Sequence, residues 1–470
     1  PRTNVAPRTS RAEPPPEQRA GAPVVSSERQ VVTAKGLARV HHWQRMLRRA
    51  YAAAARGNLS LARRLLPDDL WLDHATYSVP ETAAWDWDLR PLSRGLPAVV
   101  LPVSGRGSVL PASDVARAAV VADSVEFDDQ EVVGQLDDGM EDDSMCERGT
   151  LLCAPHAGAL ANLAVALEKT SANVSKGWAT GGGDLPCWPL RTCPFSLVDE
   201  SVRAGKPKFR LTTDLSWPHA GCMEVDGVVV SSVNGAMDRS RWAANKLVRV
   251  SEYGEALAIL QGGGARRRRV RAWGLDCEAF YRVVGRQRRE LWRNGICLPD
   301  GVQLDERCCF GDASAATKCA RISNYLVFQV RKALDAFDAE HATVDEEWVE
   351  WQTERLAAAA AAGGEASDYT PLHTFSMYID DGMGGSADDL LFGADGAPVM
   401  RDGVHLRRAQ VHYELACATM ARYGWRSSPS KEQPPAQVVD ALGVTVSLLD
   451  DRLRLSGAKR ERYAAQARVV

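Results

Sequence analysis

Residues 375–383, Phe-Ser-Met-Tyr-Ile-Asp-Asp-Gly-Met, constrain the fold more than any other segment of the chain. A short apolar run ends in two adjacent carboxylates, Asp380 and Asp381, and glycines follow at positions 382, 384 and 385. This pattern predicts a buried strand that enters a tight turn. Neighbouring carboxylates repel each other, and a cation such as Mg²⁺, which binds one or two carboxylates together with phosphate oxygens, offsets the repulsion. An exposed Asp-Asp-Gly surface turn is the alternative, because turns favour these residues.

Composition excludes some classes of protein and leaves others open. The 470 residues allow two or three domains, and 57 basic against 60 acidic residues leave a net charge of −3, so only local charge can indicate a nucleic-acid partner. There is no apolar run of about 18 residues and no secretory signal pattern, so we expect no membrane partner. The 11 cysteines have no regular spacing. Irregular cysteines indicate reduced thiols and an intracellular protein of the cytoplasm or nucleus.

Composition shifts along the chain predict five segments. Residues 1–31 are rich in Pro, Arg, Ser and Ala and predict a disordered leader. Residues 32–79 predict a basic helical segment, with a second short helix over 59–66 that ends at Pro67. The acidic residues 80–148 predict a mobile linker. Strands and helices then alternate over 149–425, with a surface insert over 335–369, and a compact tail follows over 426–470.

Two features of the first half have open interpretations. The polar face of the basic helical segment either contacts a nucleic-acid backbone or is simply solvated; its arginines are Arg39, Arg45, Arg48, Arg49, Arg63 and Arg64. A zinc site is also conceivable, although its spacing matches no paired Cys-x₂-Cys pattern. Its candidate ligands are Cys146, Cys153, His156, Cys187 and Cys193.

Basic residues alternate at the start of a predicted strand. Lys206, Lys208 and Arg210 share one face if the segment is extended. Three cations on one face repel each other unless an anion lies among them, and a triphosphate is such an anion. A solvated edge strand that carries charge against aggregation is the alternative.

Further candidate residues lie at the ends of predicted elements. Asp276 ends a short strand and Tyr281 begins a helical stretch, which suits a metal ligand beside an aromatic pocket wall or a helix N-cap beside a core aromatic. Gly311, Ser314 and Ala315 open a helix predicted over 315–337, where small side chains allow close approach of a base pair or of another helix. Lys431 follows a turn and is a candidate general acid or phosphate contact.

The order of these segments resembles the reverse transcriptases of retroelements. Lys208-Phe209-Arg210-Leu211, Asp214-Leu215-Ser216-Trp217-Pro218 and Ser232-Val233-Asn234 resemble the fingers of that family. Asp276 with Phe280-Tyr281, Phe310-Gly311 with Ser314-Ala315, Tyr378-Ile379-Asp380-Asp381, Lys431 and Leu442-Gly443 resemble the successive motifs of its palm. The resemblance covers about residues 190–460 and is greatest to tyrosine-recombinase elements of the DIRS kind. Ala316 and Phe280 depart from the usual Pro and the frequent Ala or Gly.

The resemblance implies an α+β polymerase right hand. Its parts are fingers and a palm, an antiparallel palm sheet backed by helices, and the start of a thumb from residue 426. The implied activity is RNA-directed DNA polymerisation on a template-primer with deoxynucleotides. Ribonuclease H and recombinase domains often follow in such elements, and we expect them outside this chain. A decayed relic that only binds nucleic acid and an RNA-templated RNA polymerase are the alternatives, although an aromatic residue at position 281 favours deoxynucleotides.

The resemblance also implies a role for each candidate residue. Asp276, Asp380 and Asp381 would hold two Mg²⁺ ions, for which Mn²⁺ can substitute. Lys206, Lys208 and Arg210 would bind the triphosphate. Tyr281 would exclude the ribose 2′-hydroxyl. Gly311, Ser314 and Ala315 would lie against the nascent base pair. Lys431 would protonate pyrophosphate.

Overall fold

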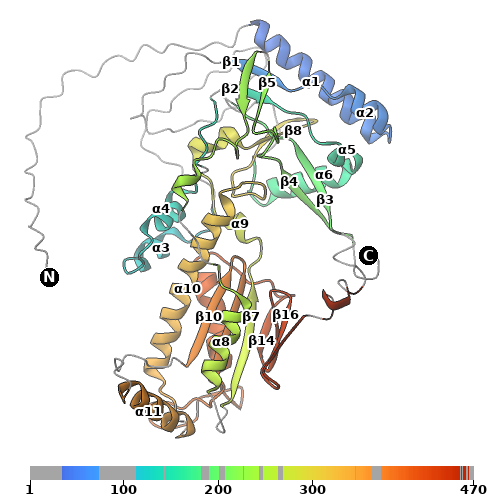
Figure 1. Ribbon diagram of the computed structural model, residues 1–470. Coiled ribbons are helices and arrows are strands. Elements are labelled where there is room, and N and C mark those ends of the chain that lie inside the picture. The colour runs from blue at the N-terminus through green and yellow to red at the C-terminus, as the bar shows by residue number, and fades with distance from the viewer. Residues whose placement is uncertain are drawn as a thin grey trace, which may run out of the picture.

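Figure 1 shows the computed structural model as an elongated molecule of mixed helices and strands. The described residues are 34–73, 113–180 without 142 and 148, 190–200, 207–262 without 226 and 243–246, 268–361 without 345, 372–461 without 456 and 458, and 464. The predicted leader, residues 1–31, lies outside these ranges. Within them, no helix combines the length and the apolar character needed to cross a membrane.

The lower part of the molecule is built on a four-stranded antiparallel sheet. The sheet has the order β10 (His373–Tyr378), β11 (Asp381–Ala387), β7 (Val270–Asp276) and β14 (Gln433–Ala436). The strand and tight turn predicted at the Asp-Asp pair are confirmed, because Ile379 and Asp380 alone connect β10 to β11. The edge strand β14 lies in the range assigned to the start of a thumb. The sheet therefore continues past the expected boundary at residue 426.

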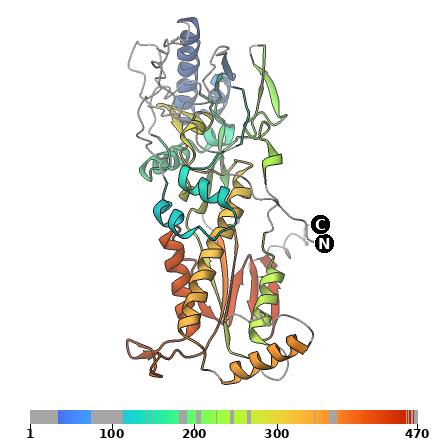
Figure 2. The same cartoon turned by 90° about the vertical axis from the view of Figure 1, so that its left-hand side faces the viewer.

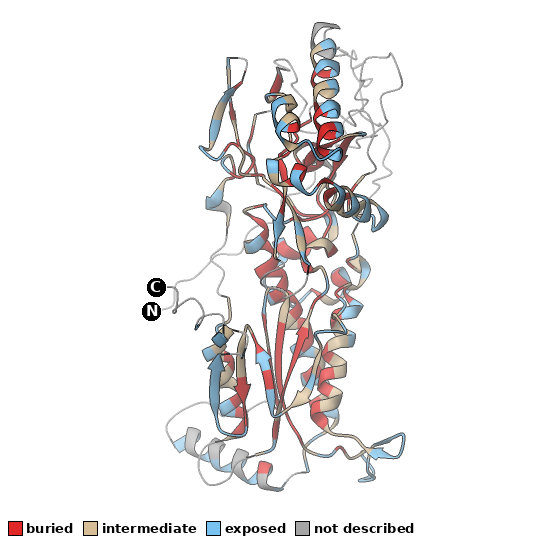
Figure 3. Ribbon diagram, turned by 90° about the vertical axis from the view of Figure 1, so that its right-hand side faces the viewer, coloured by how far each residue is buried: buried red, intermediate tan, exposed pale blue. Residues whose placement is uncertain are grey.

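Helices cover both faces of this sheet, as Figures 1 and 2 show. α10 (Ala315–Glu340) and α12 (Arg408–Arg422) cover one face, where Trp273 and Leu275 are buried. α8 (Val250–Gln261) covers the other face, where Ala272, the residue before Trp273, is buried. The alternation along β7 follows from the two-residue period of a strand. Figure 3 shows the resulting buried band along the sheet.

The glycines of β11 make room for two large aromatic rings. Trp273 of β7 and Phe375 of β10 stack with ring centroids 5.5 Å apart, across the strand that lies between them. A Cβ atom at Gly384 would lie 2.2 Å from the Trp273 ring, and one at Gly382 would lie 3.3 Å from the Phe375 ring. The Gly-rich segment is therefore a strand with bulky neighbours, where a side chain at 384 cannot fit.

The upper part consists of hairpins and helices around a second core. Its antiparallel strand pairs are β1 (Leu70–Asp73) with the distant β2 (Gly149–Leu152), and the hairpins β3 (Phe195–Asp199) with β4 (Phe209–Thr213), β5 (Cys222–Val225) with β6 (Val228–Ser231), and β8 (Gly295–Leu298) with β9 (Gly301–Leu304). Its helices are α1 (Ala34–Ala55), α2 (Leu59–Leu65), α5 (Ala157–Ala161) and α6 (Leu163–Ser175). The helical spacing predicted for the basic segment is confirmed, because Trp43, Leu47 and Tyr51 are all buried on α1.

The expected acidic linker is wrong for its described part. Residues 113–138 include α3 (Arg117–Asp123) and α4 (Gln130–Asp138), and both helices bury side chains against the core that contains α10. The Asp129 carboxylate accepts a hydrogen bond from the Val132 amide and pairs with Arg321 of α10 at 2.5 Å. Acidic residues here begin a helix and neutralise a neighbouring cation, so they do not mark a solvated linker.

The remaining helices and strands lie around the lower part. They are α9 (Phe280–Val283), α11 (Glu346–Ala361), β12 (Met400–Arg401), β13 (Val404–His405), β15 (Val438–Ala441), β16 (Val444–Ser447) and β17 (Arg452–Leu455). Two 3₁₀ turns, Arg239–Arg241 and Arg288–Arg293, belong to the upper part, where Leu291 and Trp292 are buried in the core that contains α1. The helix predicted over 315–337 is confirmed and continues to Glu340. The insert over 335–369 contains the end of α10 and all of α11, and its residues from 362 onward lie outside the described part.

Candidate active site

Three carboxylates meet at one end of the central sheet. Asp276, the last residue of β7, is paired in register with Asp381, the first residue of β11. Asp380 occupies the preceding turn, and its carbonyl oxygen accepts a hydrogen bond of 2.9 Å from the Cys277 amide. The turn is held in a left-handed conformation at Ile379, with φ of 57°. The fold therefore brings together acids that are more than a hundred positions apart in the sequence.

The crowding of these acids changes their ionisation. Burial, then the neighbouring charges of Asp380 and Asp276, raise the pKa of Asp381 from 3.8 to about 6. Burial and the charge of Asp276 also raise the pKa of Asp380. The positive charge of Lys431 opposes both changes. Burial and the neighbouring acids therefore disfavour the charged forms of Asp380 and Asp381 more than Lys431 favours them.

Lys431 contacts the acids directly. Its Nζ atom donates to both carboxylate oxygens of Asp276 at 2.7 Å, and its side chain is otherwise 60% exposed. A turn holds this lysine in place, because the Ser428 amide donates to the Asp276 carbonyl at 2.7 Å and the Lys431 amide donates to the Ser428 carbonyl at 2.9 Å. A candidate chosen from its place after a turn therefore lies within bonding distance of the acidic centre.

Lys208 and Arg210 lie on the β3–β4 hairpin, and Arg210 lies near enough to the acids for its charge to act on Asp380. Both pair with the Glu200 carboxylate, each at 3.1 Å. The charge of Arg210 also lowers the pKa of Asp380, although burial outweighs it. Cations that share one face of a strand require an anion nearby, and Glu200 is one such anion within the protein. The third residue of the predicted set, Lys206, lies outside the described residues.

An aromatic pair lies beside the acids. The rings of Tyr281 and Phe310 are 4.8 Å apart, and the Arg210 guanidinium lies 5.2 Å from the centre of the Phe310 ring. Burial raises the pKa of the Tyr281 hydroxyl, so it stays protonated at neutral pH. Phe310 is 41% exposed, which is unusual for a phenylalanine that is held by neighbours on both sides. Phe310 belongs to a motif of the sequence, but the motif does not predict its position between Tyr281 and Arg210.

Gly311 lies in the loop before α10, where this loop contacts the end of β4. Its φ is 110°, and an added Cβ would lie 2.0 Å from the Thr213 carbonyl oxygen. The Asn234 side chain donates to the Gly311 carbonyl and to the Ser216 hydroxyl, both at 2.7 Å, and accepts from the Ala313 amide. Asn234 therefore connects the loop before α10 to the loop after β4, a role that only the folded structure reveals.

Ser314 and Ala315 do not face solvent. Ser314 has no exposed surface, and its hydroxyl donates to Asp312 at 2.7 Å. Asp312 in turn pairs with the buried Arg286 at 2.6 Å. Ala315 is 2% exposed. Their contact with a base pair stays a prediction; in this structure both side chains are buried, and the exposed surface here belongs to Phe310 and Gly311.

Two clusters among the described residues have the side chains of a metal site. Asp338, His373 and His412 are fully buried, and Asp338 also accepts from the Arg408 guanidinium at 2.5 Å, so a cation already neutralises this acid. The second cluster is His156, Asp214 and His219. The conceivable cysteine site is not among these clusters, and Cys187 lies outside the described residues. Of the predicted cysteine-site ligands, His156 is the one found in a cluster, where its partners are Asp214 and His219.

No family model matches the sequence, and no curated protein matches it. Among solved structures, the chain is similar to a foamy viral protease-reverse transcriptase bound to double-stranded DNA, with 10% identity over 68% of this chain and 40% of that one, and a TM-score of 0.36. A foamy viral protease-reverse transcriptase with an RNA/DNA hybrid gives 10% identity over 74% of this chain and 36% of that one, with a TM-score of 0.33. The chain thus spans less than half of either protein. These scores are too low to carry an argument about function.

Proposed function

We propose that this chain is an RNA-directed DNA polymerase of a retroelement, most like the DIRS kind, which adds deoxynucleotides to a primer 3′-hydroxyl. The observation that carries the proposal is the convergence of Asp276, Asp380 and Asp381 at one end of an antiparallel sheet. Cations of two other segments, Arg210 and Lys431, act on the same acids. Carboxylates with cationic side chains beside them suit a phosphoryl-transfer reaction, in which negative charge on phosphate oxygens must be stabilised.

The residues present fit divalent cations with a preference for oxygen ligands. Three carboxylates are crowded together, and the pKa of Asp381 is raised to about 6. Hard carboxylate oxygens suit Mg²⁺ or Mn²⁺. When bound, two such ions would supply activation of the primer hydroxyl and neutralisation of the triphosphate. Asp276 and Asp380 are the proposed principal ligands, with Asp381 in support.

The other residues bind and orient the substrates in this proposal. Arg210 and Lys208 exchange Glu200 for the triphosphate oxygens, because an arginine fork and an ammonium both bind phosphate well. Lys431 holds a proton on Nζ that it can pass to the leaving pyrophosphate, and it must release Asp276 to do so. Tyr281 and Phe310 form an aromatic wall that a deoxyribose can contact and a 2′-hydroxyl would strike.

The alternative is a relic that binds nucleic acid and has lost catalysis. Both functions predict salt-dependent binding of RNA, because that binding depends on cations facing phosphates. Only the polymerase predicts incorporation of deoxynucleotides that depends on a divalent cation. A templated RNA polymerase would instead incorporate ribonucleotides. One assay with both kinds of nucleotide therefore separates the three.

Primer extension on poly(rA)/oligo(dT) with Mg²⁺ or Mn²⁺ tests the proposal. We expect Asp380→Asn to lower extension on the order of 10³-fold, because a charge that the transition state needs is lost, while RNA binding stays. Asp402→Asn is the matched control. Asp402 is exposed in the β12–β13 turn at φ of 51°, a conformation that Asn tolerates. Equal extension by Asp380→Asn and Asp402→Asn would contradict the proposal, and binding without extension in the unaltered chain would favour the relic.

A further inference from the structure

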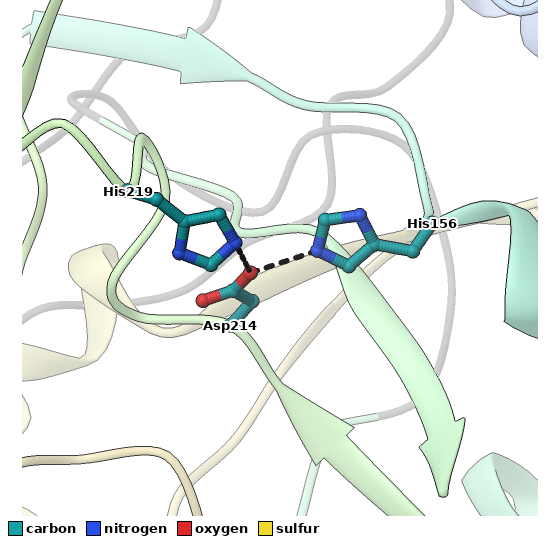
Figure 4. Close-up of side chains that lie close together, drawn as sticks. All are labelled: His156, Asp214 and His219. Carbon is teal, nitrogen blue, oxygen red and sulfur yellow. Dashed lines mark hydrogen bonds and ion pairs between the residues drawn. The ribbon is translucent and has the colours of Figure 1, made fainter.

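His156, Asp214 and His219 form a cluster that the proposed polymerase activity does not use. Figure 4 shows both imidazoles directed at one carboxylate oxygen. The Nε2 atom of His156 lies 2.8 Å from Asp214 Oδ2, and that of His219 lies 3.3 Å from the same oxygen. His156 directly precedes α5, Asp214 directly follows β4, and His219 lies in the next turn. Two segments that are distant in the sequence, the end of the loop before α5 and the loop after β4, therefore supply the cluster.

The distances suit a shared metal ion. The three ligand atoms all lie within 4.8 Å of one another. Zinc binds imidazole nitrogen and carboxylate oxygen at about 2.0–2.2 Å, so two tetrahedral ligand atoms lie about 3.3 Å apart. The contact between His219 and Asp214 already has this length at 3.3 Å. The contact of His156 is shorter and needs a side-chain adjustment of about half an ångström.

Neighbouring groups hold the ligands in this orientation. The other oxygen of Asp214, Oδ1, accepts a hydrogen bond of 3.2 Å from the Ser216 amide, which leaves Oδ2 directed at the imidazoles. The Trp217 ring lies edge-on to both imidazoles, at 5.5 Å from His156 and 5.6 Å from His219. Trp217 is itself fixed, because its Nε1 donates to Asp69 at 2.9 Å. Ligands held by such outer contacts lose little freedom when they bind a metal.

The ligand set selects the class of metal. Two imidazoles and one carboxylate suit zinc, cobalt or nickel and do not suit magnesium, which prefers oxygen alone. The His219 side chain is 66% exposed, so water can reach the remaining coordination positions. The same geometry could instead arise from two hydrogen bonds that the imidazoles of His156 and His219 make to the Asp214 carboxylate. In that case the chain would bind no metal stoichiometrically at this site.

We propose that His156, Asp214 and His219 bind one transition-metal ion of the zinc class, which fastens the loop after β4 to the segment before α5. This loop reaches the candidate active site through two contacts. Ser216 accepts from Asn234, and Asn234 donates to the Gly311 carbonyl, each at 2.7 Å. The ion would therefore steady the segment that supports Gly311, and its binding does not depend on polymerase activity.

Titration of the purified full chain with Zn²⁺ and Co²⁺, after treatment with a chelator, tests the proposal. We expect one saturable equivalent and a rise of the melting temperature on binding. His219→Gln and His156→Gln should each weaken binding at least about tenfold. His42→Gln, at an exposed position of α1, is the matched control and should bind as the unaltered chain does. Asp380→Asn should also bind normally, which separates this site from the acidic centre.

The absorption spectrum of bound Co²⁺ identifies the ligands. Cys222 is an exposed thiol that could bind metal elsewhere, so the titration is repeated after its alkylation. Nitrogen and oxygen ligands give d–d bands without the near-ultraviolet charge-transfer band of a thiolate. A thiolate band at the first equivalent, unchanged binding in His219→Gln, or no saturable binding at micromolar metal would each overturn the proposal.

Discussion

Replacing Asp381 by Asn should stabilise the metal-free protein while impairing the proposed active site. The pKa of Asp381 is raised from 3.8 to about 6, first by burial and then by the charges of Asp380 and Asp276. When the pKa of an acid is higher in the folded state than in the unfolded state, ionisation of that acid lowers the free energy of unfolding. Asn has the same shape and no charge, so the substitution removes this penalty. The stabilisation measures the combined cost of burying this carboxylate and of placing it beside Asp380 and Asp276.

The magnitude follows from the pKa change. A rise from 3.8 to about 6 corresponds to about 3 kcal/mol against the charged form. Because the side chain is only partly buried, solvent screening reduces this to about 1–2 kcal/mol. The penalty is absent well below pH 3.8, grows as the pH rises towards 6, and is complete above that value. The advantage of Asp381→Asn should therefore increase between pH 4 and pH 6 and then remain constant.

Urea unfolding in EDTA at four pH values between 4.5 and 8 measures this advantage. Asp402→Asn, in the exposed β12–β13 turn, corrects for the general effect of removing one carboxylate. Adding Mg²⁺ at pH 8 should stabilise the unaltered protein more than Asp381→Asn and so reduce the difference. A gain that does not vary with pH, or no gain at pH 8, would refute the argument that the three acids are crowded at a cost to folding.

Three further predictions concern other parts of the molecule. Gly311→Ala should destabilise the protein by about 2 kcal/mol or more in urea unfolding, because alanine is strained at a φ of 110° and its Cβ would lie 2.0 Å from the Thr213 carbonyl oxygen. An unchanged unfolding midpoint would contradict this placement of the loop before α10. Tyr281→Ala should lower the preference for deoxynucleotides over ribonucleotides at least about tenfold in competitive primer extension, since the aromatic wall of the site is lost, and an unchanged preference would remove Tyr281 from that role. The double variant Arg45→Glu, Arg48→Glu changes two exposed positions of α1. If these arginines contact phosphates, the variant should weaken RNA binding several-fold, and the slope of log affinity against log salt concentration should fall by about two. Identical slopes for the variant and the unaltered chain would mean that this face of α1 is only solvated.

Local patterns predicted the central elements well. The apolar run before Asp380 and the glycines after Asp381 predicted the strand, turn and strand that the fold contains. The helix from Ala315 follows from its periodicity and its small opening residues. These features depend on residues close in sequence, for which strand and helix periods are direct evidence. The chemical roles of the acids remain predictions, because position alone does not establish catalysis.

Contacts between distant segments were not predictable from the same patterns. Lys431 binds Asp276 across 155 positions, and the sequence indicated the turn before this lysine but not the carboxylate that it contacts. Glu200 neutralises Arg210 because β3 and β4 pair, which composition does not reveal. Runs of acids were interpreted as a linker, although Asp129 begins a helix and pairs with a cation of α10.

The candidate metal ligands show the same limit. His156 lies near Cys146 and Cys153 in the sequence, and nearness alone suggested a cysteine site. The fold instead places it against Asp214, which is 58 positions away. A cluster that combines one residue before α5 with two residues of the loop after β4 has no short spacing that a motif could describe. Only the pairing of the surrounding strands brings its ligands together.

The exclusion of a side chain at Gly384 by the Trp273 ring limits how sequences of this architecture can vary. Any residue larger than glycine at position 384 would overlap the indole, with its Cβ only 2.2 Å from the ring. A chain with alanine or serine there must therefore carry a smaller residue in place of Trp273. The two positions are cross-strand partners of β11 and β7, so they are expected to change together. Correlated substitution at this pair would reveal the register of the two acid-bearing strands from sequences alone.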